Sequence, residues 1–371
     1  TKATMKRYGN LFERIVDINN IVRAHLNARR HKTRYKEVRR VDRDVLGYCT
    51  KIRQMLIDKT YTTSEYHIFE IEDNGKHREI AELPYYPDRI IQWAIMQVLE
   101  EPLMKHFIPT TYAAMSGKKK RNKKFKKRIS ERGPHAALAK LQEYAEDKDN
   151  TRYCLKMDVK KFFPNIDKAI LKSLLRRKFK DKDLLWLLDD IVDSYDKGNP
   201  KGIPIGSFTS QYFGNFYLSY LDHWAKEQKR VKYYLRYMDD IVILSGDKEY
   251  LHRLRDEIAE YLASNLKLTI KENWQVFPSA VRGIDFVGYR YFGEFTLLRN
   301  NTKKRLKKAA KRLRRKTERG KRLNLSDRST LGSYNGILKW CDSTRLKDKT
   351  INLFIGGNNG KSKRVARPKA A

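Results

Sequence analysis

The chain has 371 residues, of which 40% are hydrophobic and 11% aromatic, so it is long enough to bury two or three packed subdomains. Its 81 Lys and Arg residues exceed its 44 Asp and Glu residues, which gives a formal net charge of +37. This excess predicts a polyanionic partner, and nucleic acid is the first candidate. The alternative is a basic protein that binds no polyanion. The sequence shows no run of about 18 apolar residues and no apolar signal-peptide core, so we expect a cytoplasmic protein without a membrane span. Three scattered cysteines without CxxC or Cys/His spacing argue against a zinc site and a disulfide framework.

The N-terminal part of the chain predicts helices and one hairpin. Apolar residues recur at helical spacing between residues 11 and 30, which predicts an amphipathic helix. The stretch "HIFEIEDNGKHREIAEL" alternates around a turn at Asp73-Asn74-Gly75 and predicts a β-hairpin. A helix with a broad apolar stripe is expected in "IIQWAIMQVLEEPLMKHF". Residues 117–133 are nearly all basic between two glycines, and we expect a mobile loop or an extended arm there.

The middle of the chain predicts strands that end in acidic residues. "RYCLKMDV" predicts a strand that ends near Asp158; Pro164 then forces a turn, and Asp167 is placed to cap the next helix. A loop rich in Gly, Pro and Ser, "GNPKGIPIGSFTSQ", opens an apolar helix. "YYLRYMDDIVIL" predicts a β-hairpin with Met238 to Asp240 at its tip.

The last third of the chain predicts helices and two short strands, the strands in "RGIDFVGYRYFGEFTLL". From Thr302 on, apolar residues recur every three or four positions on a helix whose other faces are almost wholly Lys and Arg. This basic face, over residues 303–319, would either track nucleic-acid phosphates or be a solvated surface. Residues 356–371 are rich in Gly, Asn, Ser and Lys and predict a disordered basic tail.

Three carboxylates at predicted strand ends form the candidate chemical site: Asp158, and Asp239 with Asp240. A buried carboxylate needs a partner that offsets its desolvation, and a bound metal ion would be one. If the two strands are neighbours in an antiparallel sheet, Asp158 and Asp239 point at a common volume. Two Mg²⁺ ions about 4 Å apart, held by carboxylates and phosphate oxygens, can activate a 3′-hydroxyl and stabilise the leaving pyrophosphate in nucleotidyl transfer. Another acidic pair, Asp189-Asp190, lies on a helical pattern and is interpreted as solvated surface.

Four segments in this order resemble the palm of a reverse transcriptase: "LKMDVKKFFPNID", "GIPIGSFTSQ", "YMDD" and "RGIDFVGY". Upstream, "GKHREIAELPYYPDRIIQWAI" is similar to the fingers of bacterial enzymes. The resemblance implies an α+β right-hand polymerase with fingers, an antiparallel-sheet palm and a helical thumb. It implies N-terminal helices and fingers at 1–150 with a basic insertion at about 117–133, a palm at 151–298, a thumb at 299–355 and the tail at 356–371.

Details of the loop-helix motif favour one branch, the reverse transcriptases of diversity-generating retroelements, within the bacterial and phage group II intron-like superfamily. Group II intron enzymes usually carry Gln-Gly and Ser-Pro where this chain has Ile205-Gly206 and Ser210-Gln211. "KLTIKENWQVFPSAVRGIDFVGYR" is also similar to that family, and the NAxxH and VTG signatures of retron enzymes are not evident. The basic stretch from Lys118 to Arg132 departs from the family, because it interrupts what should be a short Gly-Arg-Gly-x-His element.

Carried over position by position, the resemblance makes Asp158, Asp239 and Asp240 the catalytic metal ligands for two Mg²⁺ ions, with Mn²⁺ as a possible substitute. Phe163 matches the aromatic steric gate that would collide with a 2′-hydroxyl and so select deoxynucleotides. Its neighbour Phe162 fits the alternative, a plain core aromatic, better.

The resemblance also implies a nucleotide site and a primer grip. Arg78 matches a fingers residue that grips the incoming triphosphate, with a solvated hairpin charge as the alternative. Ile205 matches a position where accurate enzymes have a Gln that contacts the nucleotide and helps to select the correct base pair, so the resemblance implies weaker discrimination among bases. The alternative is a loop Ile whose side chain packs inward. The remaining assignments are Gly206 and Gln211 in the nucleotide site, Phe286, Gly288 and Tyr289 in the primer grip, and Lys271 as a possible general acid.

The leading hypothesis is an RNA-directed DNA polymerase that makes cDNA from dNTPs on an RNA template and holds the RNA–DNA duplex. The family implies adenine-directed errors, mutagenic retrohoming, a structured template-repeat RNA and a small, basic, oligomeric accessory variability protein, in a bacterial, archaeal or phage-infected cell. A defence-associated or other bacterial reverse transcriptase with a non-coding RNA partner is the alternative enzyme. The alternative of another class is a catalytically inactive RNA-binding protein, which would have no reason to keep buried acids that only a cation offsets.

Overall fold

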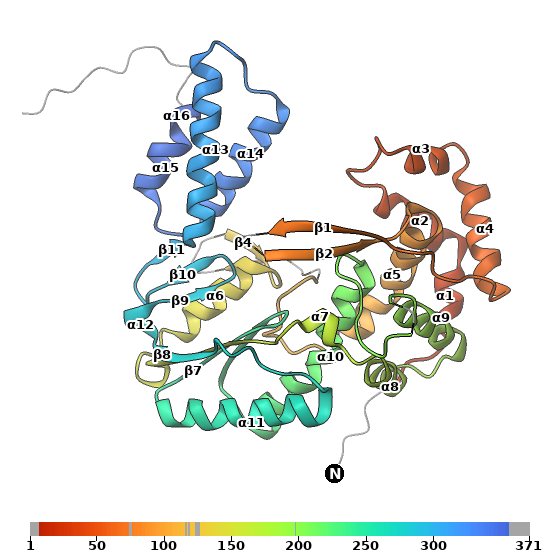
Figure 1. Ribbon diagram of the computed structural model, residues 1–371, viewed down its shortest axis with the longest axis horizontal. Coiled ribbons are helices and arrows are strands. Elements are labelled where there is room, and N and C mark those ends of the chain that lie inside the picture. The colour runs from red at the N-terminus through yellow and green to blue at the C-terminus, as the bar shows by residue number, and fades with distance from the viewer. Residues whose placement is uncertain are drawn as a thin grey trace, which may run out of the picture. The chain divides into compact units, whose positions relative to one another are not determined.

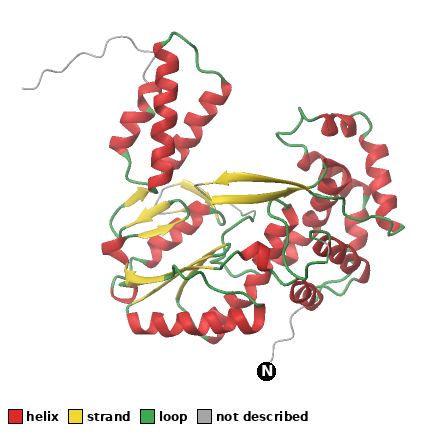
Figure 2. Ribbon diagram, in the orientation of Figure 1, coloured by secondary structure: helices red, strands yellow, loops and turns green. Residues whose placement is uncertain are grey.

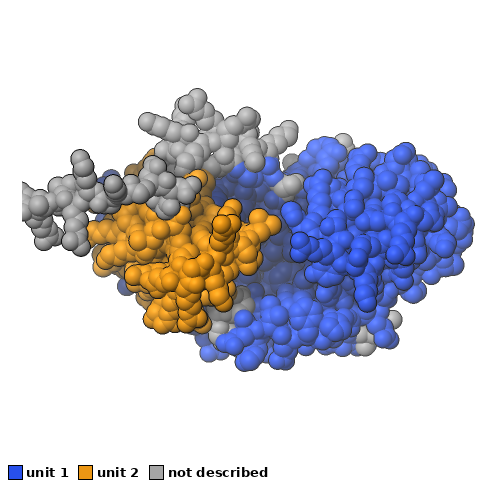
Figure 3. All heavy atoms as spheres, turned by 90° about the horizontal axis from the view of Figure 1, so that it is seen from above, with its two compact units in different colours: residues 1–144, 148–277 blue, residues 145–147, 278–371 orange. Residues whose placement is uncertain are grey.

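The computed structural model describes residues 7–73, 76–115, 117, 119–122, 127–196 and 198–355. The chain forms two compact units, coloured separately in Figure 3: residues 1–144 with 148–277, and residues 145–147 with 278–371. The predicted tail at 356–371 and the tip of the predicted N-terminal hairpin, Asn74-Gly75, lie outside the described residues.

Short helices begin the first unit and enclose an apolar core (Figure 1). The single helix predicted over residues 11–30 is in fact two helices, because the side chain of Asp17 accepts hydrogen bonds from the amides of Asn19 and Asn20 and so starts a new helix. Helix α2 packs against α4 and α5, and α5 buries residues on most of its circumference. The helices of this region are α1 (Phe12–Val16), α2 (Ile18–Ala28), α3 (Lys36–Asp42), α4 (Val45–Ile57) and α5 (Ile90–Met104).

One hairpin lies between α4 and α5, and a second follows α5 (Figure 2). The predicted hairpin is confirmed: β1 (His67–Asp73) pairs antiparallel with β2 (Lys76–Glu82). Within the basic run, β3 (Lys119–Asn122) pairs antiparallel with β4 (Lys127–Ser130). For these residues the mobile-loop alternative is wrong, whereas a two-stranded ribbon is compatible with an extended arm. Backbone pairing needs no apolar side chains, which is why the composition of the run did not predict strands.

A four-stranded sheet lies at the centre of the first unit, with the strand order β6-β7-β5-β8. β5 runs antiparallel to β7, and β6 and β7 form the predicted hairpin. Helix α11 packs on β5 and β7, α6 packs on β6, and α10 packs on α11. The elements are α6 (Pro134–Tyr144), β5 (Tyr153–Asp158), α10 (Phe208–His223), β6 (Tyr233–Tyr237), β7 (Asp240–Ser245), α11 (Lys248–Leu266) and β8 (Gln275–Pro278).

Between β5 and α10 the chain forms α7 (Phe162–Asn165), α8 (Lys168–Lys178) and α9 (Lys182–Asp193). The predicted cap is confirmed, since an Asp167 carboxylate oxygen accepts a hydrogen bond from the Ile170 amide at 2.9 Å. The solvated-surface interpretation of the second acidic pair is wrong for Asp190. Its half-buried carboxylate accepts hydrogen bonds from both the amide and the hydroxyl of Thr63, at 2.9 and 2.6 Å.

The second unit combines a three-stranded antiparallel sheet, in the order β11-β10-β9, with helices. Leu306, Ala310 and Leu313 form the buried stripe of the long basic helix α13, as the spacing predicts. The elements are α12 (Ser279–Arg282), β9 (Ile284–Phe286), β10 (Tyr289–Tyr291), β11 (Thr296–Leu298), α13 (Asn300–Glu318), α14 (Leu325–Leu338), α15 (Thr344–Thr350) and α16 (Asn352–Ile355).

The predicted α+β fold class is confirmed, since antiparallel sheets and separate helices make up both units. Across the residues that the structure describes, no helix is both long and apolar enough to cross a lipid bilayer.

Candidate active site

Two neighbouring strands carry the three predicted acids. Asp158 ends β5 and lies directly opposite Asp240, the first residue of β7. Asp239 occupies the turn between β6 and β7, and its carbonyl accepts a hydrogen bond from the Val159 amide at 3.2 Å. Met238, beside it in the turn, has a left-handed φ of +58°, a conformation that few non-glycine residues adopt. The tight turn thus brings carboxylates that are about 80 positions apart in the chain to one end of the sheet.

The ammonium of Lys271 lies between two of these carboxylates. Its Nζ is 3.6 Å from Asp158 Oδ2 and 3.8 Å from Asp239 Oδ2, so both oxygens face one positive charge. The Lys271 amide also donates a hydrogen bond to the Asp158 carbonyl at 2.8 Å, which holds the lysine backbone against the end of β5. The point shared by Asp158 and Asp239 therefore already attracts a cation.

Asp240 turns to a different partner, forming an ion pair with Lys156, which lies two positions before Asp158 on β5. Burial raises the pKa of Asp240 to about 6, although the ion pair with Lys156 opposes that effect. Burial and the nearby Asp158 carboxylate raise the pKa of Asp239. Positive charge added at this end of the sheet would lower both pKa values, so Asp239 and Asp240 favour a nearby cation.

The arrangement fits a divalent ion held by two carboxylates. No cluster of three or more His, Cys, Asp or Glu side chains with the geometry of a metal site occurs among the described residues, and Asp240 is paired with Lys156. Mg²⁺, however, is commonly bound through one or two carboxylates, with substrate phosphates and waters completing its shell. Asp158 and Asp239 are about one-third exposed and can accept such a partly hydrated ion.

A buried ion pair beneath the turn escaped the sequence analysis. Asp222 on α10 and Arg236 on β6 are both 0% exposed, and two of the guanidinium nitrogens bond the carboxylate at 2.7 and 2.5 Å. Arg236 also donates to the Met238 carbonyl at 2.9 Å, so it fixes the turn that carries Asp239. A sequence signal existed, since each residue puts a lone charge into an otherwise apolar run, "YLDHW" and "YYLRY".

This pair has further partners that satisfy its polar atoms. The Asp222 carboxylate accepts hydrogen bonds from the hydroxyls of Thr111 and Tyr234, at 2.9 and 2.7 Å. The guanidinium of Arg236 donates to the side-chain and backbone oxygens of Asn215, at 3.1 and 3.2 Å. A buried ion pair is stabilising only when its remaining donors and acceptors are bonded in this way.

Phe163 lies beside the same turn. It is half-buried on α7, and a Cβ placed on Gly214 of α10 would contact Phe163 at 3.3 Å, Phe162 at 3.1 Å and the Met238 sulfur at 3.6 Å. The two phenylalanines and Met238 therefore gather around one glycine at the acidic end of the sheet. Phe162 is 3% exposed, as expected of a core aromatic, whereas Phe163 keeps part of its ring accessible.

The residues expected to hold the nucleotide lie on β2 and the loop before α10. Arg78 is exposed on β2. The Ala81 amide on the same strand donates to the Ile205 carbonyl at 3.1 Å, which ties the hairpin to that loop. Gly206 has φ +108°, and a Cβ there would lie 3.2 Å from Ile80, so this close approach favours glycine. Gln211 lies one turn into α10 and lines a cavity together with Gly206.

The residues expected to grip the primer belong to the second unit. Phe286 and Tyr289 are buried, and the Tyr289 hydroxyl donates to the Ile337 carbonyl at 3.1 Å. Gly288 lies between them in a two-residue turn with Val287, where both residues have positive φ. Such a turn matches the twist of the flanking strands.

The basic face predicted on residues 303–319 is present in the same unit. Lys308, Lys311, Arg312, Arg315, Lys316, Arg319 and Lys321 line one shallow depression along α13 and its C-terminal end. Asp327, capping α14, forms ion pairs with Lys316 and Arg312, and the other five cations in the depression keep a large positive excess.

Comparison with known proteins assigns the family. Residues 70–291, more than half of the chain, match the family described as reverse transcriptase (RNA-dependent DNA polymerase). Protein YkfC of Escherichia coli (strain K12) is 23% identical over 259 residues, which cover 59% of this chain and 64% of YkfC. Two solved structures are similar: apo telomerase from Candida tropicalis (TM-score 0.42, 13% identity, 62% of this chain and 47% of that chain) and Candida albicans telomerase with a TWJ fragment of telomeric RNA (0.44, 10%, 68% and 51%). The chain thus spans between about half and two thirds of the length of these relatives, and by the family match it belongs to the reverse transcriptase (RNA-dependent DNA polymerase) family.

Proposed function

We propose that this chain is an RNA-directed DNA polymerase, which joins the 3′-hydroxyl of a primer to a dNTP on an RNA template. The observation that carries the proposal is the convergence of Asp158 and Asp239 on one cation, at 3.6 and 3.8 Å from Lys271 Nζ, in a chain of the reverse transcriptase family. The net charge of +37 supports it, since a nucleic acid supplies the matching negative charge.

Asp158 and Asp239 would hold Mg²⁺, or Mn²⁺ in its place, and Asp240 would join them once released from Lys156. The bound metal supplies Lewis acidity, which lowers the pKa of a primer hydroxyl and offsets charge on the leaving pyrophosphate. Lys271 would keep a positive charge beside the reacting phosphate and would return a proton to pyrophosphate. Phe163 would exclude a 2′-hydroxyl from the sugar site.

Primer extension on an RNA template tests the proposal. Wild-type protein should incorporate dNTPs with Mg²⁺, and Asp239→Asn should lower the rate by about 10³-fold, which corresponds to about 4 kcal/mol of lost transition-state stabilisation. Asp189→Asn is the matched control, because it removes one acid of the other Asp-Asp pair, on α9, and leaves the strand ends intact. Incorporation that is equal in the Asp239 and Asp189 variants would refute this site.

Within the family, we propose mutagenic synthesis for a diversity-generating retroelement, with a structured template-repeat RNA and a small basic accessory protein as partners. Ile205 at the place of a glutamine, and Ser210-Gln211 at the place of Ser-Pro, support this choice. We also propose the fingers, palm and thumb division at residues 1–150, 151–298 and 299–355. Ile205→Gln should raise the accuracy of synthesis opposite template adenine. An unchanged error spectrum in sequenced cDNA would show that Ile205 does not set base discrimination.

A further inference from the structure

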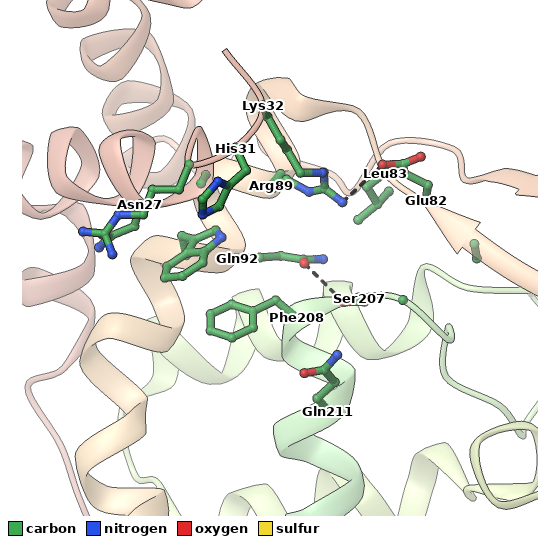
Figure 4. A pocket seen from close by; sticks show the side chains of 15 residues that line it. Asn27, His31, Lys32, Glu82, Leu83, Arg89, Gln92, Ser207, Phe208 and Gln211 are labelled. Carbon is green, nitrogen blue, oxygen red and sulfur yellow. Dashed lines mark hydrogen bonds and ion pairs between the residues drawn. The ribbon is translucent and has the colours of Figure 1, made fainter. Parts of the chain in front are cut away.

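A cavity of about 400 Å³ opens in the first unit (Figure 4). Two residues of the expected nucleotide site, Gly206 and Gln211, line part of it, and the rest of its wall has no role given above. It lies between the end of α2, the end of β2, the start of α5 and the loop that leads into α10. Its walls include Asn27, Lys32, Leu83, Gln92, Ser207 and Phe208. The volume falls within the range of pockets that hold small ligands, about 300–1,000 Å³.

The side chain of Gln92 extends into this cavity with one polar group unsatisfied (Figure 4). The residue is 4% exposed, and its Oε1 accepts a hydrogen bond from the Ser207 hydroxyl at 3.2 Å. Its Nε2 has no hydrogen-bond partner among the described residues. A buried amide left without a partner destabilises the fold, so a ligand with an acceptor atom would satisfy it.

Next to Gln92 the cavity wall is aromatic and apolar. The rings of Trp93 and Phe208 stack at 4.5 Å with an angle of 27° between their planes. Behind this wall the buried Tyr212 meets Phe208 edge-on. Leu83 adds a buried aliphatic side chain. A stacked aromatic wall beside an amide donor suits a planar heterocycle with acceptor atoms, which is the chemistry of a nucleobase.

The rim of the cavity is positively charged. Arg30, Lys32 and Arg89 line it, against a single carboxylate, Glu82, which pairs with Arg89 at 3.3 Å. Burial and then the neighbouring Arg89 lower the pKa of Lys32, so an anion beside Lys32 would be favourable. A phosphate at the rim with its base inside satisfies both parts of the cavity.

The position of the cavity indicates which nucleotide enters it. Its wall includes Gly206, in the loop that Ala81 holds through Ile205, and this loop belongs to the expected nucleotide site. In the proposed polymerase, the bases of the primer and of the incoming nucleotide would be paired with the template near that site. The template ahead of the newly forming pair is the strand that still presents an unpaired base.

Building on the proposed polymerase function, we propose that this cavity captures one unpaired base of the RNA template ahead of the templating position. Gln92 donates a hydrogen bond to the base, the Trp93–Phe208 wall packs against it, and the basic rim holds its phosphate. The polymerase thus senses one template nucleotide outside the nascent base pair.

Binding of primer–template series that each carry one abasic position in the single-stranded template tests the proposal, measured by fluorescence anisotropy in EDTA so that chemistry plays no part. For wild-type protein, one abasic position should weaken binding by about 10-fold, the effect of losing one stacked base. In Gln92→Leu the intact template should bind more weakly, and the same abasic position should cause almost no further loss. Gln142→Leu, a buried glutamine on α6 away from the cavity, should keep the wild-type pattern.

A structural role for Gln92 predicts a different outcome. Gln92→Leu removes an unsatisfied buried amide, so its unfolding temperature should equal or exceed that of the wild type, and a lower one would show that the residue serves the fold. Equal sensitivity of wild type and Gln92→Leu at every abasic position would overturn the proposal. The polymerase proposal fails separately, by absence of primer extension.

Discussion

Two sets of opposite charges lie beside the turn that joins β6 to β7, and the protein holds them in different ways. Asp222 and Arg236 are 0% exposed, and every carboxylate oxygen has a bonded donor. Asp158 and Asp239 are about one-third exposed and share Lys271 at 3.6 and 3.8 Å, beyond hydrogen-bonding distance. The buried pair is closed to exchange and serves to position the turn. The partly exposed carboxylates of Asp158 and Asp239 can exchange the ammonium of Lys271 for another cation from solvent.

The largest contrast in stability should come from removing one acid of each set. Asp222→Asn leaves the Arg236 guanidinium buried without a counter-charge, so the free energy of unfolding should fall by about 3–5 kcal/mol. Asp239→Asn removes repulsion with Asp158, so this free energy should change by less than about 1 kcal/mol or rise. Urea denaturation measures both, and similar losses would abolish the distinction between the two sets.

A smaller change, Arg236→Lys, keeps the buried charge and removes the fork that bonds Asp222 and the Met238 carbonyl together. We expect the rate of nucleotide addition to fall by about 10-fold or more with little change in KM for dNTP, because Asp239 moves from its place. Arg176→Lys, in the surface pair with Asp189, is the matched control and should alter neither rate nor stability measurably. A rise in KM alone would argue that Arg236 does not position the acids.

The smallest expected effect concerns Lys271. If its ammonium competes with a metal ion for Asp158 and Asp239, Lys271→Met should lower the Mg²⁺ concentration for half-maximal activity by about 5-fold, since such exposed pairs contribute up to about 1 kcal/mol. If Lys271 also returns a proton to pyrophosphate, the maximal rate should fall in the same titration. If the Mg²⁺ concentration for half-maximal activity did not change, Lys271 and the metal ion would not compete for the same site between Asp158 and Asp239.

The sequence predicted those features that depend on neighbours along the chain or on adjacent strands. Asp158 and Asp239 could be expected to converge because Asp158 ends one predicted strand and Asp239 lies at the tip of a predicted hairpin. Antiparallel pairing of β5 with β7 then brings the two residues together. The ion pair of Asp240 with Lys156 was not predictable, since it depends on the register of β5 against β7. The Asp222–Arg236 pair needs the packing of α10 under β6, and no local pattern encodes that contact.

The same limit applies to the rest of the fold. The split of the predicted N-terminal helix followed from a single capping carboxylate, Asp17, whose preference for the start of a helix outweighed the continuous apolar spacing. The cavity at Gln92 combines four segments, whereas in the sequence Gln92 is only one residue of a predicted apolar helix.

The hydrogen bond between the Ala81 amide and the Ile205 carbonyl has a mechanical consequence. It couples the long β1–β2 hairpin to the loop that leads into α10, so a swing of the hairpin would pull on this loop. A cross-link between the hairpin and the loop would then restrict the motion of both. In the proposed polymerase, the entry of substrate past the hairpin and the shape of the loop that lines the site would change together.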